Sequence, residues 1–288
     1  MGFFHRHRGL TPYLLLLPGL AWLAIFFLVP LGFLAYQSLQ SGTFDVGYAF
    51  DWAWGNYWDA FQRYHPWLVR SLVYAGLATV IALVISYPLA YWIAFRGGQW
   101  KNVLLVMIIA PFFVTYLIRT LAWETILADQ GPIVGVLRDV GILGDNGRIL
   151  ATSTAVVAGI TYNFLPFMAL PLYVSLEKID RRLIEAATDL YASRAVAFRK
   201  VTLPLAIPGL FAGSLLTFIP AMGDFINAAL LGTPRQFMIG NVIQSKFLVT
   251  QDYPGAAALS FILMTFILIG IFIYARLLGA QNLSEAAI

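Results

Sequence analysis

The chain has 288 residues, of which 60% are hydrophobic, 15% aromatic and only 11% charged, and its formal net charge is +4. Soluble domains carry about 25% charged residues, so this composition excludes an ordinary water-soluble protein and indicates an integral membrane protein. No cysteine is present, which excludes disulfides, thiolate metal sites and cysteine nucleophiles.

Apolar runs of sufficient length predict membrane spans, because about 30 Å of hydrocarbon is crossed by roughly 20 helical residues. The chain contains six such runs, which predict an all-α integral membrane fold forming a single transmembrane domain over residues 1–288. It comprises an N-terminal helix and a core of five further helices within residues 68–279. The predicted spans are 12–37, 68–95, 102–123, 152–176, 204–231 and 255–279.

The N-terminal run follows the residues HRHR and resembles a signal peptide. Its apolar part is too long for a signal peptide, so we expect it to be retained as the first span. Lys and Arg set the orientation, because cytoplasmic loops near the spans keep positive charge. With the N-terminus inside, eleven Lys and Arg residues lie on the cytoplasmic side and seven on the outer side. We therefore expect both termini in the cytoplasm.

Two outer loops carry signals of their own. Residues 38–67 are rich in Trp, Tyr and Asp, and their tryptophans suit the headgroup region of the membrane. Residues 128–150 contain the apolar segment PIVGVLRDVGIL, which is too short to span, so we expect a short helix at the outer surface.

Ionisable residues inside spans are costly and are treated as functional by default. Near the outer end of the third span, Arg119 and Glu124 are five residues apart, too far for an ideal same-face pair. We expect Arg119 to extend to the membrane interface, and we take Glu124 as a candidate for attracting cations. In the fifth span, Asp224 follows Pro220 and Gly223, two residues that interrupt helices.

The fifth span also contains a small-xxx-small spacing at Gly209 and Gly213, which predicts close helix packing. Asp224 lies about 30 Å from the inner end of this span, toward the outer side. It has two readings that the sequence leaves open: a substrate-binding carboxylate, or the cap of a helix that restarts after Gly223.

A polar, basic stretch interrupts the apolar chain between the fourth and fifth spans, at about residues 177–203. Apolar residues recur at three- and four-residue steps, so in a continuous helical register they form one stripe that can dock on a partner. The stripe consists of Leu183, Ala187, Tyr191, Ala195 and Phe198. A basic amphipathic helix resting on anionic lipid explains the same charge pattern.

This stretch resembles the EAA motif of ABC-transporter permeases, which runs EAA, three residues, Gly, nine residues, Ile, one residue, LeuPro. The matching or corresponding positions are Glu185, Ala186, Ala187, Tyr191, Val201, Leu203 and Pro204, and Asp189, one of the three unspecified residues, is a further candidate for coupling to the ATPase. Tyr191 stands where the motif has glycine. If that glycine adopts a positive φ, tyrosine costs on the order of 1 kcal/mol there. Either the turn differs in this chain or Tyr191 packs against the ATPase.

The resemblance implies a six-helix permease of the type I ABC importer fold, with cytoplasmic coupling helices, in a bacterial inner membrane. It also implies partners: a second homologous permease, two copies of a cytoplasmic ATPase, and an external substrate-binding protein, with lipid around the spans and no nucleic acid. ATP and Mg²⁺ belong to the ATPase, and this chain is expected to hold no cofactor. Its sequence has no GxxxxGK[ST] phosphate loop, no catalytic motif and no metal-ligand spacing.

The segments LLLLPGLAWLAIFFLVPL and PAMGDFINAALLGTPRQFMIGNVIQSKF are similar to permeases of the spermidine/putrescine importers. A carboxylate pairs with ammonium groups while aromatic faces stabilise the cation, so a polyamine suits this chain. The candidate substrate residues are Asp224, Tyr162, Trp123, Asn227, Phe225 and Glu124, with Phe164 and Asn163 beside them. Two alternatives stay open: an ABC permease for an amino-acid derivative, a phosphonate or ferric ion, and a proton-coupled secondary transporter in which Asp224 or Glu124 titrates.

Overall fold

The computed structural model describes residues 11–144 and 147–278, and the side chains of residues 16–144 and 147–276. Within these residues, five helices are long and apolar enough to cross a membrane, or six if one bent helix pair is counted as a span. The chain divides into two compact units, residues 1–63 with 243–262, and residues 64–242 with 263–288. The all-α expectation is confirmed, although one small sheet is present.

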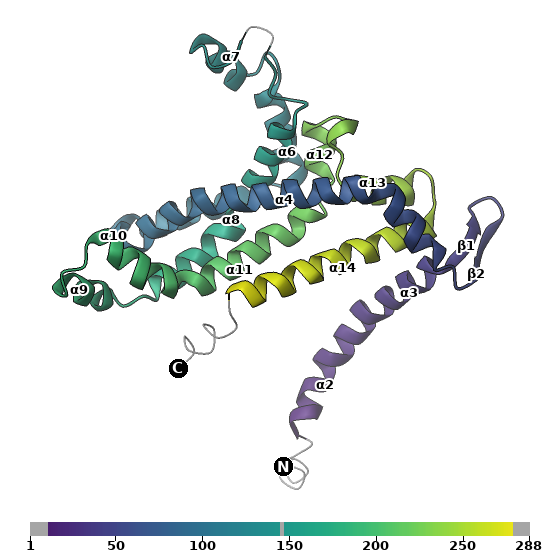
Figure 1. Cartoon of the computed structure of the whole chain (residues 1–288), viewed down its shortest axis with the longest axis horizontal. Coiled ribbons are helices and arrows are strands. Elements are labelled where there is room, and N and C mark those ends of the chain that lie inside the picture. The colour runs from purple at the N-terminus through teal and green to yellow at the C-terminus, as the bar shows by residue number, and fades with distance from the viewer. Residues whose placement is uncertain (1–10, 145–146, 279–288) are drawn as a thin grey trace. The chain divides into compact units, whose positions relative to one another are not determined.

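The first unit begins with a long apolar helix and continues into a β-hairpin (Figure 1). The helix consists of α2 (Thr11–Leu23), a π-helical turn η1 (Ala24–Leu28) and α3 (Val29–Ser38). The hairpin pairs β1 (Gln40–Thr43) with β2 (Gly47–Phe50) in antiparallel register, with Gln40 opposite Phe50. These strands were not predicted from the sequence. Gly42 has φ +118°, and a Cβ there would meet the Gly47 carbonyl oxygen at 2.2 Å, so the turn requires glycine.

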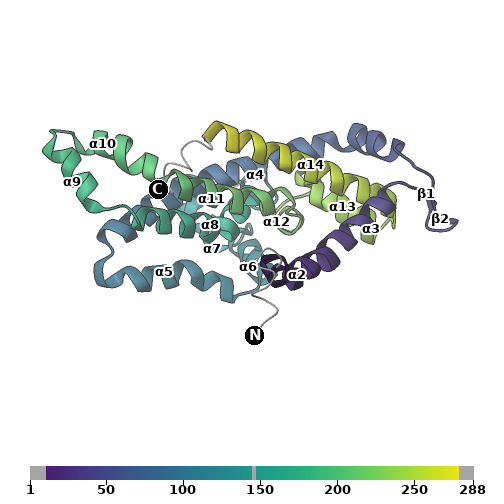
Figure 2. The same cartoon turned by 90° about the horizontal axis from the view of Figure 1, so that it is seen from below.

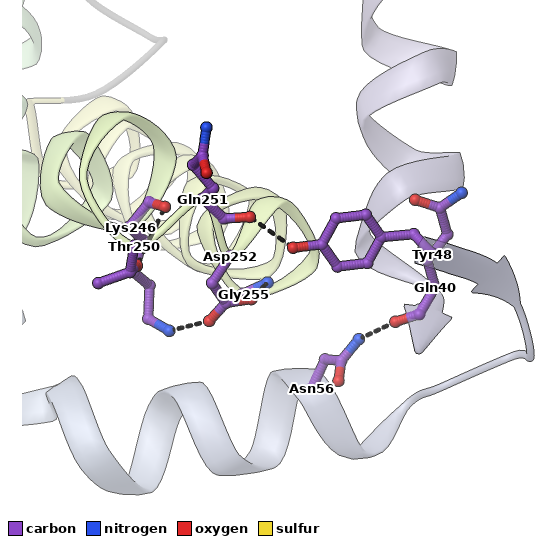
Figure 3. Close-up of polar contacts among 8 residues, drawn as sticks. All are labelled: Gln40, Tyr48, Asn56, Lys246, Thr250, Gln251, Asp252 and Gly255. Carbon is purple, nitrogen blue, oxygen red and sulfur yellow. Dashed lines mark hydrogen bonds and ion pairs between the residues drawn. The ribbon is translucent and has the colours of Figure 1, made fainter. Parts of the chain in front are cut away.

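Hydrogen bonds hold the hairpin to its neighbours in the same unit (Figure 3). Asn56 Nδ2 donates to the carbonyl oxygens of Ser38 (2.9 Å) and Gln40 (2.8 Å). The Tyr48 hydroxyl donates to the carbonyl oxygen of Gln251, in the turn between α13 (Ile239–Leu248) and α14 (Tyr253–Leu278). Burial raises the pKa of Tyr48 above its ordinary value.

The second unit is organised around α8 (Ser153–Glu177) and α11 (Leu203–Met222), which pack side by side. A Cβ at Gly209 would lie 2.4 Å from Ser175 Cβ, and one at Gly213 would lie 2.9 Å from the Met168 carbonyl oxygen. The predicted close packing at these two glycines is therefore confirmed. Buried apolar side chains from α4 (Gly55–Arg96) and α8 complete the core, among them Ile93, Ile160, Leu172 and Leu176.

The predicted third span, 102–123, is not one straight helix. After the 3₁₀ turn η2 (Gly98–Trp100), it consists of α5 (Lys101–Ile109), the 3₁₀ turn η3 (Ala110–Phe113) and α6 (Tyr116–Leu127), with a 95° bend at the break before α6. Pro111 lies in η3 and Val114 is extended, with φ −103° and ψ 136°. Proline removes a backbone donor and clashes with the preceding turn, which accounts for the break.

The predicted fifth span, 204–231, also breaks where its sequence indicated. Helix α11 ends at Met222, and α12 (Ile226–Leu231) restarts after Gly223. The 3₁₀ turn η5 (Pro234–Gln236) then leads to α13. The short helix predicted in the loop after α6 is present as α7 (Pro132–Asp139), at the far end of α6 in Figure 1.

Candidate functional site

Asp224 lies in the break between α11 and α12 and is 6% exposed. Its Oδ1 accepts hydrogen bonds from the backbone nitrogens of Ile226 (2.9 Å) and Asn227 (3.1 Å). These are the first backbone donors of α12, so the carboxylate occupies the capping position that was one of the two readings of this residue. Its Oδ2 accepts from Tyr116 and from the side chain of Asn227, each at 2.6 Å.

Tyr116 connects the two helix breaks. It is the first residue of α6, directly after the extended pair Val114 and Thr115. Its hydroxyl donates to Asp224 and accepts a 2.5 Å hydrogen bond from Asn227 Nδ2. Tyr116 was not among the residues selected from the sequence. Pro111, near the middle of an apparently continuous span, was the signal that a helix break and a polar site lay there.

The polar network continues into α8 through Asn163, which is 1% exposed. Asn163 Nδ2 donates to Thr120 Oγ1 (3.2 Å) and to Asn227 Oδ1 (3.3 Å), while its Oδ1 has no hydrogen-bond partner among the described residues. Buried polar side chains inside an apolar helical bundle are costly unless they are satisfied. This network, consisting of Asp224, Asn227, Tyr116, Thr120 and Asn163, is therefore the strongest candidate for a functional centre within the described residues.

Arg119 does not extend to the interface as expected, and its side chain is buried, with 8% exposure. Its guanidinium carbon lies 5.6 Å from the centre of the Phe112 ring and 5.7 Å from that of Tyr116. Nε and Nη1 have no hydrogen-bond partner among the described residues. The 95° bend explains the error, because it turns the start of α6 away from the direction of α5. Aromatic faces stabilise this cation to some extent.

The aromatic candidates do not form one group with Asp224. The rings of Trp123 and Tyr162 meet edge to face, with centroids 5.3 Å apart. Both line a cavity of about 520 Å³ between α4, α6 and α8, whose lining does not include Asp224. Phe225 lies on the other side of the α12 start, where its carbonyl oxygen accepts a 2.8 Å hydrogen bond from Asn241 Nδ2.

Two further candidates have simple positions. Phe164 is buried against Tyr116, with ring centroids 5.9 Å apart, and so packs beside the network. Glu124 is partly exposed on α6, and no ion pair joins it to Arg119 among the described residues. Within the same residues, no group of three His, Cys, Asp or Glu side chains is placed to hold a metal ion.

The elbow, residues 177–203, joins α8 to α11 through two short helices, α9 (Arg181–Asp189) and α10 (Arg194–Ala197). Both views place α9 and α10 beyond one end of α8 and α11 (Figures 1 and 2). The Asp180 side chain caps α9 by accepting from Arg182 N at 3.0 Å, and Ser193 caps α10 by accepting from Val196 N at 3.4 Å. The prediction of one continuous helical stripe from Leu183 to Phe198 is therefore wrong. Helix α9 ends at Asp189 and α10 begins at Arg194, so the stripe residues do not share one helix.

Tyr191 forms the turn between α9 and α10 with φ +60°. The position where the motif has glycine thus adopts the left-handed conformation that glycine favours. Of the other motif positions, Glu185, Ala186 and Ala187 lie on α9, Val201 lies in the π-helix η4 (Phe198–Thr202), and Leu203 and Pro204 begin α11. The candidate coupling residue Asp189 is the last residue of α9.

The elbow contacts the rest of the second unit at its two ends, where it joins α8 and α11. The Phe198 ring packs edge to face on Tyr87 of α4, with centroids 5.7 Å apart. Lys101 of α5 forms an ion pair with Glu177, the last residue of α8. In contrast, α9 has no fully buried residue: Ile184 packs partly against the core, whereas Leu183 is 49% exposed.

Comparison with known proteins identifies the class. Residues 86–278 match the family described as binding-protein-dependent transport system inner membrane component. The chain is 39% identical over 257 residues to the spermidine/putrescine transport system permease protein PotB of Haemophilus influenzae, a match covering 89% of this chain and 90% of that protein. It is 32% identical over 294 residues to the inner membrane ABC transporter permease protein YdcU of Escherichia coli, covering 97% and 93%.

Solved structures share the architecture. A bacterial ABC transporter involved in the import of alginate has a chain that matches with a TM-score of 0.69 and 17% identity, covering 96% of both chains. The MetNI methionine ABC transporter in an inward-facing conformation gives a TM-score of 0.57 and 18% identity, covering 73% of this chain and 92% of that one. The fold is that of a type I ABC importer permease. The chain belongs to the family of inner membrane components of binding-protein-dependent transport systems.

Proposed function

We propose that this chain is the membrane permease subunit of an ATP-driven importer that moves polyamines such as spermidine and putrescine into the cytoplasm. The observation that carries the proposal is its similarity to the permease PotB over nearly the whole of both chains. The partners would be a second homologous permease, two copies of a cytoplasmic ATPase that bind ATP and Mg²⁺, and an external binding protein. Both termini would lie in the cytoplasm of a bacterial cell.

The substrate proposal rests on the carboxylate at the helix break. Asp224 accepts four hydrogen bonds in this structure, so it is held in place without a substrate. An ammonium group that displaces the Tyr116 hydroxyl from Oδ2 would replace a neutral donor with a positively charged one and so form an ion pair with the carboxylate. The Trp123 and Tyr162 rings line a cavity that does not include Asp224, so in this proposal they would offer apolar faces to a part of the methylene stem away from the carboxylate. Glu124 would attract the cation toward the site.

The proposed mechanism is alternating access driven by the ATPase. When the ATPases close on nucleotide, the elbow at Glu185, Ala186 and Ala187 moves with them and changes the side from which the cavity is open. The affinity for the solute must differ between the two states, because only differential binding shifts such an equilibrium. We assign that difference to Asp224, which follows the end of α11, the helix that leaves the elbow.

The test is substrate-stimulated ATP hydrolysis and uptake by the co-purified complex in liposomes, with the binding protein loaded in turn with spermidine, putrescine, an amino-acid derivative, a phosphonate and ferric ion. Stimulation by the polyamines alone is expected. Stimulation by one of the other solutes would show that the importer carries that solute instead of a polyamine, by the same ATP-driven mechanism. Uptake that continues without ATP and without an ATPase, but stops with a proton uncoupler, would establish secondary transport instead.

A further inference from the structure

Tyr191 is one of the residues other than glycine that have a positive φ in the described chain, and it differs from the others. These others are Trp52, Ala151 and Gln251. The ring of Trp52 packs on Phe50 with centroids 4.9 Å apart, and the backbone N–H of Ala151 donates to Leu231. The carbonyl oxygen of Gln251 accepts the Tyr48 hydroxyl. Each of these conformations is thus supported by a contact inside the chain.

Tyr191 has no such support from its side chain, which is 100% exposed. Its backbone N–H donates to the carbonyl oxygen of Thr188 at 2.9 Å, which any residue in this turn can do. The strain of a left-handed tyrosine is therefore not offset by packing within the described chain. The backbone hydrogen bonds that close the end of α9, from Tyr191 to Thr188 and from Ala192 to Ala187 (3.0 Å), hold the left-handed turn, whereas no described residue covers the ring.

The tip of the elbow also exposes a second apolar side chain, since Leu190 is 81% exposed. Two adjacent large apolar residues in full contact with water indicate a binding surface. Aromatic anchors that enter a pocket of the partner carry a large share of binding energy in protein interfaces. Leu190 and Tyr191 form such a pair at the point of the elbow farthest along the chain from α8 and α11.

The charges beside Tyr191 favour a protein over lipid as the occupant. Asp189 is two residues away and exposed, and Glu185 is exposed one helical turn earlier. The negative surface of an anionic membrane repels both carboxylates. The basic residues that a membrane would attract lie elsewhere in the elbow, at the start of α9 and from Arg194 onward.

We propose that Tyr191 is an anchor that inserts into a pocket of the cytoplasmic ATPase and selects an ATPase carrying that pocket. This inference rests on the proposed function and goes beyond it. The proposed function has the elbow helices dock on the ATPase. The inference adds a contact made by the Tyr191 side chain, at a position where the motif has glycine. The partner is identified by its chemistry: an apolar pocket with polar or basic groups near Asp189. The strain at Tyr191 is then offset in the assembled complex.

The test distinguishes the effect of the Tyr191 ring on ATPase binding from the effect of the strained backbone at this position. Tyr191→Phe keeps both, Tyr191→Ala removes the ring and keeps the strain, and Tyr191→Gly removes both. The full complex in nanodiscs is stripped of ATPase, and rebinding of the ATPase is measured for each variant. We expect roughly tenfold weaker rebinding for Ala and Gly and less than a twofold change for Phe. For the stripped permease, Gly alone raises the unfolding temperature.

A matched control is Gln251→Gly, which relieves a positive φ in the other unit of the chain. It keeps the carbonyl that Tyr48 uses and should leave ATPase rebinding unchanged. Equal weakening by Gln251→Gly, or wild-type rebinding by Tyr191→Gly and Tyr191→Ala, overturns the inference. A wild-type permease that never retains an ATPase overturns the proposed function instead, so the two failures are distinct.

Oxidative footprinting of the wild-type chain identifies the occupant. The Tyr191 ring should react freely in nanodiscs that hold the stripped permease, and it should become protected when the ATPase is added. Protection already present without the ATPase would mean that lipid or a second permease covers the ring, which overturns the inference.

Discussion

The hydroxyl of Tyr116 donates a 2.6 Å hydrogen bond to Oδ2 of Asp224, 108 residues further along the chain. This bond joins the break between α5 and α6 to the break between α11 and α12. Two interrupted helices thus share one buried polar contact. A helix break inside a membrane protein is tolerated where its polar groups are satisfied by neighbours, and here each break contributes to satisfying the other.

Tyr116→Phe tests this contact. The substitution removes the donor to Asp224 and the acceptor for Asn227, so we expect the free energy of unfolding to fall by about 1–3 kcal/mol. Thermal unfolding of the purified permease in detergent measures the change. The matched control is Tyr162→Phe, because no hydrogen bond of the Tyr162 hydroxyl is present among the described residues. Equal stability of the two variants would show that the bond does not hold the breaks together.

Asp224→Asn and Asp224→Ala separate the two readings of this residue. Asparagine caps helices about as well as aspartate, so Asp224→Asn should keep the two cap bonds while losing the Oδ2 acceptor of Tyr116 and Asn227 and the charge that pairs with an ammonium group. Asp224→Ala should lose the cap bonds as well, with about 1 kcal/mol attributable to the cap. Polyamine uptake by the reconstituted complex should fall sharply in both variants. Normal uptake by Asp224→Asn would remove this carboxylate from the substrate site.

Gly209→Ala tests the contact between α8 and α11. An added Cβ would lie 2.4 Å from Ser175 Cβ and 2.6 Å from the Pro171 carbonyl oxygen, neither of which is the end of a flexible side chain. We expect a loss of about 1–3 kcal/mol from overpacking. At Gly76 of α4, no atom lies within 4 Å of an added Cβ. Gly76→Ala should therefore be neutral or slightly stabilising, since alanine is the better helix former.

Arg119→Met tests the cost of a buried cation that has aromatic neighbours but no ion-pair partner among the described residues. Methionine has a similar length and no charge, and removing an uncompensated buried charge is often stabilising. We expect the unfolding temperature of the isolated permease to stay equal or rise. Arg70→Met is the contrasting variant, because Arg70 Nη1 donates to the Phe237 carbonyl oxygen at 2.9 Å and its loss should lower that temperature. A clear drop for Arg119→Met would reveal a stabilising partner for this guanidinium.

Tyr48→Phe tests how the hairpin is held. The substitution removes the hydroxyl that donates to the Gln251 carbonyl oxygen while keeping the ring, which packs 5.7 Å from Tyr253. Amide hydrogen exchange should become faster in both strands and in the turn at Gln251. Exchange in α8 should not change. Unchanged exchange in the hairpin would mean that Asn56 alone holds it.

The fold was predictable where composition alone decides it. Long apolar runs predicted the spans, and the small residues Gly209 and Gly213 correctly indicated close packing. The bend after Phe113 was missed because the residues on both sides of it are apolar, so hydropathy continues through a break in the backbone. Arg119 was misplaced for the same reason, since its position was inferred from a straight span.

Only some of the candidate site was predictable. A carboxylate in an apolar span and a motif position without its glycine are both visible in the sequence, and they led to Asp224 and Tyr191. Tyr116 was not visible, because a tyrosine in an apolar run is typical of packing, and its partner is remote in sequence. The aromatic set was divided by the fold, since Trp123 and Tyr162 share a cavity that Phe225 does not line.

Helix α11 leaves the elbow at one end and stops beside Asp224 at the other. It is continuous over 20 residues, a length of about 30 Å. A rod of that length converts a tilt of about 10° at its base into a displacement of roughly 5 Å at its tip, which is more than enough to separate a donor from its acceptor. A tilt of α11 at the elbow can therefore separate Asp224 from the Tyr116 hydroxyl at the other end of the same helix.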